Sequence, residues 1–279
     1  MAETHQTEDA PIKLLVVICT YNRAHLLRQT LACLTELDRP EACTLGILVV
    51  NNCCTDNTDQ VIDEFRQCLP LMSVHEGKPG LSNARNRGIQ EAVAWGADYI
   101  VWTDDDVRPY PQWLTSYCQI YRAHPGAAVF GGPVEPWFEV EPPQWIRDNW
   151  HLLYYAFAVR DLGPAVAPLD PSQELPFGAN FSIRTSQQAA HPFDPKLGVI
   201  KGKRLAGEET VVMQAILSGG ADGWWQPAAR VRHFIERERL NLHYITRYFY
   251  GAGITQAMMD TPPGRRLFGR PAWLIRAMV

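Results

Sequence analysis

Three kinds of feature are missing from this sequence of 279 residues, and each absence excludes a class of protein. No segment approaches the run of about 20 apolar residues that a membrane-spanning helix requires, and no signal-like apolar stretch lies near Met1. The seven cysteines contain neither a Cys-x-x-Cys pair nor a spacing typical of zinc ligands. These absences argue against a transmembrane protein, a disulfide-bonded domain and a zinc module, so we expect a cytoplasmic protein with reduced thiols.

Motifs of several common enzyme classes are missing as well. The segment Gly251-Ala252-Gly253 lacks the third glycine and the preceding strand of a dinucleotide-binding fingerprint. The glycines between Gly198 and Arg204 have the wrong spacing for a phosphate-binding loop and no Ser or Thr follows them. A Gly-x-Ser-x-Gly nucleophile elbow does not occur. A kinase and a Rossmann dehydrogenase are therefore disfavoured.

The sequence has little net charge, and that charge is unevenly distributed. Its formal value is −4, which argues against a general nucleic-acid-binding protein. Residues 230–279 hold nine arginines and three acidic residues, a local charge of +6, which leaves −10 for the rest. A basic segment of this kind suits an anionic substrate or an anionic membrane, and we expect peripheral contact with the inner face of the cell membrane.

The residues that are present have the composition of a soluble globular protein, 46% hydrophobic and 20% charged. The first half alternates β-rich runs with helical patterns, the order expected of βαβ units around a mostly parallel sheet. We therefore expect a single compact α/β domain. The expected strands span residues 14–19, 46–50, 71–75 and 99–102, and the expected helices span residues 25–37, a stretch ending near Phe65, and residues 82–95. The last helix is expected to turn four residues toward the sheet, Ala84, Gly88, Ala92 and Val93.

The second half begins with a segment rich in proline and tryptophan, from Pro133 to Pro176. Periodicity fades there, so we interpret it as an excursion that covers a site. Its tryptophans offer flat apolar faces suited to sugar rings, although core packing explains them equally well. Regular structure is expected to resume with a strand at 179–183, a helix at 208–217, a strand ending near His233 and an amphipathic helix at 240–251.

Three consecutive aspartates, Asp104, Asp105 and Asp106, follow the fourth expected strand. In open α/β sheets, ligands bind beyond the carboxyl ends of the strands, where this triplet falls. Neighbouring carboxylates repel one another, and a bound divalent cation removes that repulsion. A solvated acidic turn that caps the next helix is the alternative. The buried strand before the triplet, and an acidic pair and a histidine further along the chain, favour a metal-dependent transfer site.

The acidic pair is Glu208-Glu209, at the start of an expected helix, and the histidine is His233, on an alternating strand pattern. Alone, the pair is explained by charge complementarity at a helix N-terminus, and an isolated strand histidine is usually structural. A glutamate close to another carboxylate and partly desolvated has a raised pKa, however, as a general base requires. Adjacent Cys53 and Cys54 we interpret as turn and core residues rather than as metal ligands.

Taken in order, these motifs resemble those of the inverting family 2 glycosyltransferases, which have a GT-A fold. The resemblance covers about residues 12–250, and six motifs in the correct order make it specific. It rests on residues 15–23 ending in Thr20-Tyr21-Asn22-Arg23, residues 49–58, residues 80–92 with Ala84-Arg85-Asn86, the DxD motif Asp104-x-Asp106, Gly178-Ala179-Asn180, and Glu208-Glu209 followed by His233.

The resemblance implies a nucleoside-diphosphate sugar as donor, with a UDP-sugar favoured, and a saccharide or lipid-linked acceptor. It implies that Asp106 and His233, with Asp104, hold Mn²⁺ or Mg²⁺ at the diphosphate, and that Glu209 beside Glu208 is the catalytic base. Donor contacts are implied for Thr20, Tyr21, Asn22, Arg23, Asn51, Gly80, Ala84, Arg85, Asp104 and Asp105, with Arg237 or Arg239 as further candidates at the diphosphate.

Two positions depart from the family pattern. Asn51 stands where the family usually has the aspartate that accepts a hydrogen bond from uracil, and its carbonyl oxygen can still accept one. Glu209 stands where the family usually has aspartate, so its carboxyl group lies one methylene further from the backbone. The second departure affects the placement of the base and leaves its chemistry unchanged.

The resemblance thus implies an enzyme that moves a sugar to a hydroxyl group with inversion, in the biosynthesis of cell-surface polysaccharide or glycolipid, with no nucleic-acid partner. The expected organisation is a flexible N-terminus (1–11), a nucleotide-sugar-binding half (12–130), an acceptor-binding and catalytic half (131–239) and a basic amphipathic segment (240–279). A nucleotidyltransferase on a related fold is one alternative, although residues 20–23 supply no glycine for the triphosphate-binding loop it needs. A non-catalytic carbohydrate-binding module is another, and the intact acidic residues and histidine argue against it.

Overall fold

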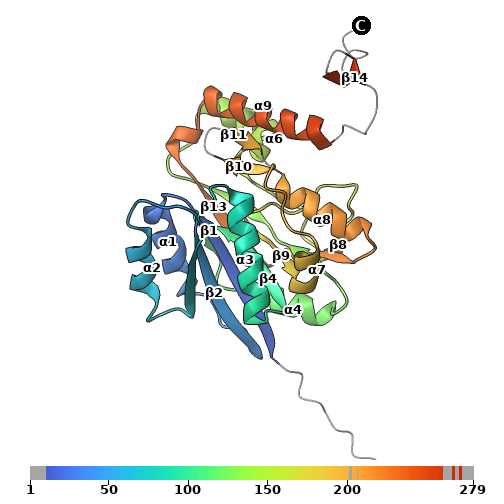
Figure 1. The fold of residues 1–279 in the computed structure, drawn as a ribbon. Helices are drawn as coiled ribbons and strands as arrows, with labels where there is room; N and C mark the ends of the chain where they lie inside the picture. Colours follow the sequence, from blue (N-terminus) through green and yellow to red (C-terminus); the bar gives the residue numbers. More distant parts are fainter. Residues whose placement is uncertain (1–10, 201–202, 206, 260–265, 268–269, 272–279) are drawn as a thin grey trace, which may run out of the picture.

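The computed structural model describes residues 11–200, 203–205, 207–259, 266–267 and 270–271, and its centre is a mixed β-sheet flanked by helices (Figure 1). Within these residues the sheet has eight strands in the order β3-β2-β1-β4-β9-β6-β12-β8. Its first four positions are parallel strands, β3 (Leu71–His75), β2 (Cys43–Asn51), β1 (Ile12–Thr20) and β4 (Tyr99–Asp104). The βαβ order expected of the first half is therefore present.

The other half of the sheet is mixed in direction. Strand β9 (Phe181–Arg184) lies antiparallel between β4 and β6 (Val129–Gly131), while β12 (Gly223–Trp225) is parallel to β6 and antiparallel to β8 (Ala167–Pro168). Pairing of β9 with β4 brings chain segments about 80 residues apart to the centre of the sheet, a long-range contact that local patterns do not reveal.

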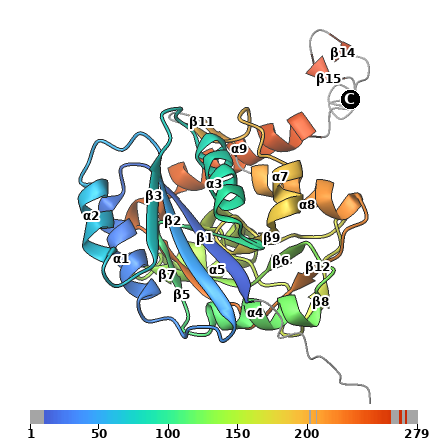
Figure 2. The ribbon, with the colours of Figure 1, turned by 60° about the horizontal axis from the view of Figure 1, so that its bottom comes forward.

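Both faces of the sheet are covered, which explains the continuous apolar run of its central strand. Alternate residues of β1 enter two different cores, Leu14, Val16 and Ile18 on one face and Leu15 and Val17 on the other, and all five are fully buried. Helices α1 (Ala24–Leu34), α2 (Thr58–Phe65) and α4 (Trp113–Ala123) cover the first face, and α3 (Leu81–Trp95) and α8 (Glu208–Ser218) cover the second (Figure 2).

A second, three-stranded sheet lies beside the first and decides where the site forms. Its central strand β13 (Val231–Ile235) pairs antiparallel with β5 (Val107–Pro109) and parallel with β7 (Val134–Phe138). Since β5 begins directly after the aspartate triplet, this pairing carries a late strand to the end of β4.

The proline- and tryptophan-rich excursion contains more regular structure than its sequence indicates. Besides β7 and β8 it forms α5 (Gln144–Asp148), α6 (Trp150–Leu153) and a 3₁₀ turn η1 (Tyr154–Phe157). A third apolar cluster joins this segment to β13 and to the C-terminal helix. The remaining elements are α7 (Thr185–Ala190), β10 (Gly198–Ile200), β11 (Lys203–Leu205), η2 (Arg237–Arg239), α9 (Leu242–Met259), β14 (Arg266–Leu267) and β15 (Arg270–Pro271).

Most expected elements are present with shifted ends. Strand β3 has the expected bounds, the expected helix at 208–217 is one residue longer, and α9 runs eight residues past the expected end at Gly251. One orientation was wrong: Val93 is 52% exposed, whereas Ala84 and Ala92 are fully buried. Gly88 does face the sheet, because a Cβ there would lie 2.7 Å from Cγ1 of Val17.

The segments at the two ends of the chain lie largely outside the described residues. This applies to the flexible N-terminus expected at 1–11, of which residues 1–10 are not described, and to most of the basic segment beyond Met259. Within the part of the chain that the structure describes, no helix is both long and apolar enough to cross a membrane.

Candidate functional site

The polar residues singled out by the sequence gather at the carboxyl ends of β1 and β4. These neighbouring parallel strands are in register from Leu14 with Tyr99 to Cys19 with Asp104, so Thr20 and the aspartate triplet leave the sheet side by side. Asp104 ends β4, and Asp105 and Asp106 form the turn before β5. The sequence pattern thus places the triplet at the sheet edge where α/β proteins bind ligands.

His233 reaches the triplet through the second sheet. Its strand partner in β5 is Val107, and the N–H of Phe234 donates to the carbonyl oxygen of Asp106 at 2.9 Å. As a result, Nε2 of His233 lies 3.4 Å from Oδ2 of Asp106, and both side chains are buried. The structure brings together the two residues that the resemblance paired across 127 positions of sequence.

The orientation of the His233 ring is set by the excursion. Nδ1 lies 2.8 Å from the carbonyl oxygen of Phe157, an atom that only accepts hydrogen bonds. Nδ1 therefore carries a proton, and in the neutral ring the lone pair is on Nε2, which faces Asp106. A backbone carbonyl that fixes a histidine in this way is common among metal-binding histidines.

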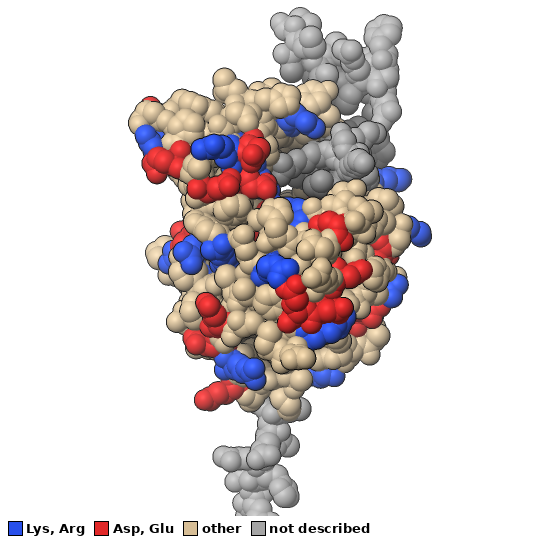
Figure 3. Space-filling model, turned by 90° about the vertical axis from the view of Figure 1, so that its left-hand side faces the viewer, with Lys and Arg blue, Asp and Glu red and all other residues tan. Residues whose placement is uncertain are grey.

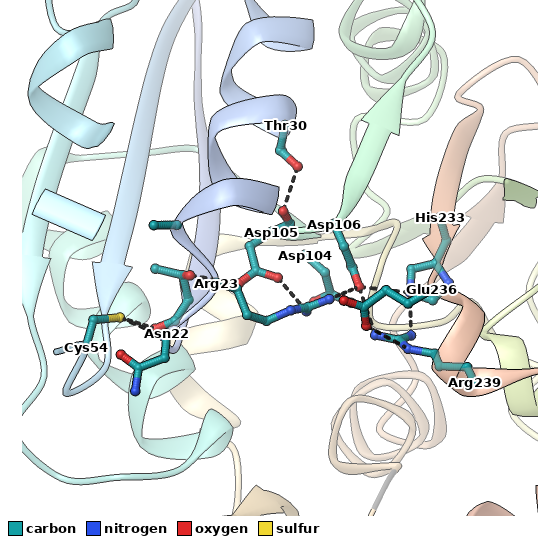
Figure 4. A network of polar contacts seen from close by, with 12 residues as sticks. Asn22, Arg23, Thr30, Cys54, Asp104, Asp105, Asp106, His233, Glu236 and Arg239 are labelled. Atoms are coloured by element: carbon teal, nitrogen blue, oxygen red, sulfur yellow. Dashed lines mark hydrogen bonds and ion pairs between the residues drawn. The ribbon is translucent and has the colours of Figure 1, made fainter. Parts of the chain in front are cut away.

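Asp106 is surrounded by positive groups (Figure 4). Its Oδ2 accepts hydrogen bonds from Arg23 at 2.6 Å and from Arg239 at 3.2 Å. Burial opposes ionisation of this carboxyl group, but the neighbouring His233 and Arg23 outweigh it and hold the pKa of Asp106 well below its usual value. Asp106 is therefore a carboxylate at neutral pH, and its other oxygen, Oδ1, is buried without a hydrogen-bond partner.

The oxygen Oδ1 of Asp106, which has no hydrogen-bond partner, indicates whether Asp106 and His233 fit a divalent cation. A buried carboxylate oxygen without a donor is costly, and a hard cation is a suitable partner for it. No group of three or more His, Cys, Asp or Glu side chains among the described residues could hold a metal ion. Asp106 and His233 supply two ligands, which is sufficient for a cation that takes its other ligands from substrate phosphates and water.

Asp105 shares the guanidinium of Arg23 with Asp106 but also contacts β1 and α1. Its carboxylate accepts hydrogen bonds from the hydroxyl of Thr20 and from Arg23, both at 2.7 Å, while its backbone oxygen accepts from Thr30 at 2.8 Å. These contacts tie the triplet to β1 and α1. Thr20 and Asp105 are each at most 3% exposed, so the donor contacts expected of them remain predictions, and their observed role is to anchor the turn.

The acidic pair lies at the first turn of α8, beside Arg85 from α3. Oε1 of Glu208 accepts from Arg85 at 2.8 Å, Oε2 of Glu209 lies 3.7 Å from the same nitrogen, and Oδ1 of Asp104 lies 3.9 Å from the other terminal nitrogen. Oε1 of Glu209 accepts from the N–H of Gly178 at 3.2 Å. The guanidinium of Arg85 thus links the end of β4 to the acidic pair.

The two glutamates differ in burial. The side chain of Glu208 is 3% exposed and that of Glu209 is 12% exposed, so Glu209 is the one open to a substrate. Burial, with the charge of Glu209, raises the pKa of Glu208 to about 7 despite the opposing effect of Arg85. The raised pKa expected of the acidic pair therefore falls on the inner glutamate.

Three residues expected to contact the donor nucleotide lie at the ends of strands β1 and β2. Tyr21 is 43% exposed, and Asn22 adopts a positive φ of 52° while its Oδ1 accepts from the N–H of Thr55 at 2.7 Å. Asn51 is buried, with its Oδ1 accepting from the N–H of Cys54 at 2.9 Å and its amide donating to Asp59 at 2.8 Å. The carbonyl oxygen of Asn51 keeps one further acceptor position.

The start of α3 holds two residues with expected donor contacts, Gly80 and Ala84. Gly80 precedes the helix with a φ of 124°, a conformation that favours glycine, and its N–H donates to Oδ1 of Asn52 at 2.9 Å. Ala84 is fully buried between the helix and the sheet. The observed role of Ala84 is close packing, and the donor contact expected of it stays a prediction.

Several features of the site were not visible in the sequence. The hydrogen-bond partners of Arg23 and Arg85 lie 82 to 123 residues away along the chain, so no local pattern indicates them. Trp150 packs against Phe138 and Phe157 at 5.7 Å between ring centroids, which gives this residue of the excursion a core role. Trp137, by contrast, lies under the guanidinium of Arg108, 3.3 Å from its ring centre.

Comparisons with known proteins identify the family of this chain. The profile of Glycosyl transferase family 2 matches residues 15–167, more than half of the chain. The chain is 24% identical to the succinoglycan biosynthesis protein ExoM of Rhizobium meliloti (strain 1021), over 92% of this chain and 78% of that protein.

Solved structures share the same fold. S. aureus TarS 1-349 in complex with UDP-GlcNAc matches with a TM-score of 0.60 and 17% identity, over 84% of this chain and 60% of that chain. The mannosyltransferase PcManGT of Pyrobaculum calidifontis, in complex with GDP-Man and Mn²⁺, matches with a TM-score of 0.58 and 18% identity, over 91% of this chain and 65% of that chain. The chain therefore spans less than two thirds of the length of either structure.

The central sheet with helices on both faces, together with the solved structures that match it, defines an α/β protein of the GT-A type, as expected from the sequence. The chain belongs to Glycosyl transferase family 2.

Proposed function

We propose that this protein is a metal-dependent, inverting glycosyltransferase that moves a sugar from a nucleoside diphosphate to a hydroxyl group. The observation that carries this proposal is the convergence of Asp104, Asp106 and His233 with the Glu208–Glu209 pair at one edge of the sheet. A site for the leaving diphosphate and a base for the acceptor then lie on the two sides of Asp104. Intact groups for both tasks also speak against a module that only binds carbohydrate.

The donor side of the site is built from Asp106, His233 and the two arginines next to them. A divalent cation held by Asp106 and His233 would supply positive charge to the departing diphosphate. Arg23 and Arg239, which are 28% and 14% exposed in their side chains, are placed to donate hydrogen bonds to phosphate oxygens. Asp104, at 35% side-chain exposure, is the member of the triplet most open to the ribose or the cation.

The acceptor side is built around Glu209. The bond from the anomeric carbon to the diphosphate oxygen breaks while a bond to the acceptor oxygen forms from the opposite face, which inverts the anomeric centre. Glu209 takes the proton of the acceptor hydroxyl, and the diphosphate leaves with the electron pair. The hydrogen bond from Gly178 holds one carboxylate oxygen in place, so the other oxygen of Glu209 is the one available to the proton.

The donor class is supported by structural neighbours that bind a UDP-sugar or a GDP-sugar, with a UDP-sugar favoured because TarS is bound to UDP-GlcNAc. The similarity to ExoM supports a role in cell-surface polysaccharide or glycolipid biosynthesis, with a saccharide or lipid-linked acceptor.

A thermal-shift panel of nucleoside diphosphates and their sugars, with and without Mn²⁺, tests the donor class and the need for a cation together. Stabilisation by one diphosphate that depends on the cation supports the proposal, and a flat response to the whole panel rejects it. The anomeric configuration of the product, read by NMR, tests inversion.

We further propose a cytoplasmic location with peripheral contact to an anionic membrane. Helix α9 exposes apolar side chains on one face, Leu242, Phe249, Tyr250 and Ile254, and Arg247 is exposed next to them. On the face in Figure 3, by contrast, acidic and basic side chains of the described residues are interspersed. Co-sedimentation with vesicles that contain anionic lipid should exceed that with zwitterionic vesicles and should fall in a Phe249→Ser, Tyr250→Ser variant. Equal binding to both kinds of vesicle would contradict the membrane proposal.

A further inference from the structure

Arg85 is a charged side chain in the interior whose contacts join two functional parts of the site. Only 3% of the residue is exposed, and its terminal nitrogens lie 2.8 Å from Glu208, 3.7 Å from Glu209 and 3.9 Å from Asp104. The three carboxylates come from two elements, the end of β4 and the start of α8. One guanidinium therefore holds the donor side and the acceptor side at a fixed separation.

The surroundings of Arg85 leave its guanidinium little freedom to move. The rings of Phe193 and Phe181 lie 5.3 and 5.8 Å from its central carbon. On the other side, a Cβ added to Gly178 would come within 2.6 Å of Nη2 of Arg85 and within 3.4 Å of Oε1 of Glu209. Glycine at this position is thus a requirement of the close approach of Arg85 and Glu209.

A buried cation with these partners is poorly placed to bind the donor diphosphate. To reach a phosphate, Arg85 would have to leave Glu208, and a buried carboxylate without its partner is strongly destabilising. Arg23 and Arg239, which lie next to Asp106, have more exposed side chains, at 28% and 14%. The diphosphate contact that the family resemblance implies for Arg85 is therefore replaced by a different role.

We propose that Arg85 is a positioning residue, which fixes the carboxylate of Glu209 relative to Asp104 so that the base and the donor are correctly aligned. This role rests on the proposed function. It requires the planar fork of an arginine, because a lysine ammonium can neutralise the charge but cannot hold three carboxylates from two nitrogens. Glu208 serves as the inner anchor of the fork, and Glu209 remains free to take the proton.

The test combines two substitutions that move the guanidinium or replace its fork without removing positive charge. Arg85→Lys keeps the charge, and Gly178→Ala keeps the arginine but forces its Nη2 to move, because the added Cβ would lie 2.6 Å from that atom. Arg184→Lys is the matched control, because Arg184 also binds through two nitrogens, Nη2 to the hydroxyl of Tyr99 and Nε to the carbonyl oxygen of Ala127, at the opposite end of β4.

Two readouts separate positioning from donor binding. UDP affinity is measured calorimetrically with Mn²⁺, and turnover is measured as hydrolysis of UDP-GlcNAc, in which water takes the place of the acceptor. We expect Arg85→Lys to lower kcat on the order of 100-fold, and Gly178→Ala to lower it at least about tenfold, because misplacement by about 1 Å has effects of this size. UDP affinity and the donor KM should change by less than about threefold. Arg184→Lys should lower the melting temperature and leave kcat unchanged.

Each alternative gives a different pattern. Wild-type kcat in Arg85→Lys or in Gly178→Ala overturns the positioning role. A loss of UDP affinity in Arg85→Lys that matches the loss of turnover identifies Arg85 as a diphosphate ligand instead and also overturns it. If Arg85→Lys does not fold, Gly178→Ala decides alone. A folded wild-type protein that binds no nucleoside diphosphate and hydrolyses no sugar nucleotide rejects the proposed function itself, and the role of Arg85 with it.

Discussion

Substituting Asp106 by Asn separates its part in donor binding from its part in stability. Its Oδ2 accepts charged hydrogen bonds from Arg23 and Arg239, each worth about 1.5–3 kcal/mol in a typical protein. In this variant Arg23 still pairs with Asp105, and Arg239 still pairs with Glu236. Loss of the charge at position 106 also relieves its repulsion with Asp105. We therefore expect a net loss of only about 2 kcal/mol in the free energy of unfolding, or roughly 4–8 °C in melting temperature.

Asp105→Asn is the matched control for this variant. Asp105 pairs with the same Arg23 at 2.7 Å, is equally buried and adjoins Asp106, but its carboxylate faces Thr20 rather than His233. We expect a smaller loss of stability, because burial raises the pKa of Asp105 to about 7 and folding therefore favours its neutral form. Calorimetric titration with UDP should show that Mn²⁺ strengthens binding to the wild type and to Asp105→Asn by at least about tenfold, which corresponds to about 1.4 kcal/mol. The strengthening should vanish in Asp106→Asn, and its persistence there would refute the assignment of Asp106 as the cation ligand.

Three further substitutions test other parts of the site and the fold. Glu209→Gln keeps an acceptor for the N–H of Gly178 but removes the base, so hydrolysis of UDP-GlcNAc should fall by about 10²- to 10⁴-fold with UDP affinity unchanged, and normal turnover would exclude Glu209 as the base. The pKa of Glu208 is raised from 4.5 to about 7, so the folded protein binds more protons than the unfolded chain in this range and its stability falls as the pH rises through it. Glu208→Gln should therefore gain in melting temperature relative to the wild type between pH about 5 and about 8, and a constant difference would contradict the raised pKa. Gly88→Ala places a Cβ 2.7 Å from Cγ1 of Val17 and should cost about 1–3 kcal/mol in urea unfolding, whereas an unchanged midpoint would show that the helix and sheet can separate freely there.

The parts of the fold that follow from local patterns could be predicted from the sequence. Continuous apolar runs identified the buried parallel strands, and helical spacing identified α1 and α3, because these patterns depend on residues a few positions apart. Strand β3 was predicted with its observed bounds, Leu71–His75. Val93 was placed on the wrong face because it is apolar, although the helix turns it to solvent. Apolar residues are common on protein surfaces, so the apolar character of a residue does not by itself decide whether it faces the core.

The sequence predicted which residues form the site, but not how they are arranged. The order of the motifs located Asp106, His233 and Glu209, but the distances between them depend on pairings such as β5 with β13, which join distant segments. The family resemblance assigned Asp104 and Asp106 to the cation and Asp105 to the donor, but for the same reason the sequence did not show which partners each side chain faces. Asp105 turns inward to Thr20 and Arg23, while Asp106 turns toward His233, and only the turn geometry after β4 separates the two.

The most direct test of a transfer site at this sheet edge is a crystal structure of the wild-type protein with UDP and Mn²⁺. An anomalous-difference map should contain the manganese peak between Oδ1 of Asp106 and Nε2 of His233, in contact with the diphosphate. A manganese peak bound elsewhere, with Arg23 and Arg239 still paired with Asp106, would contradict the account.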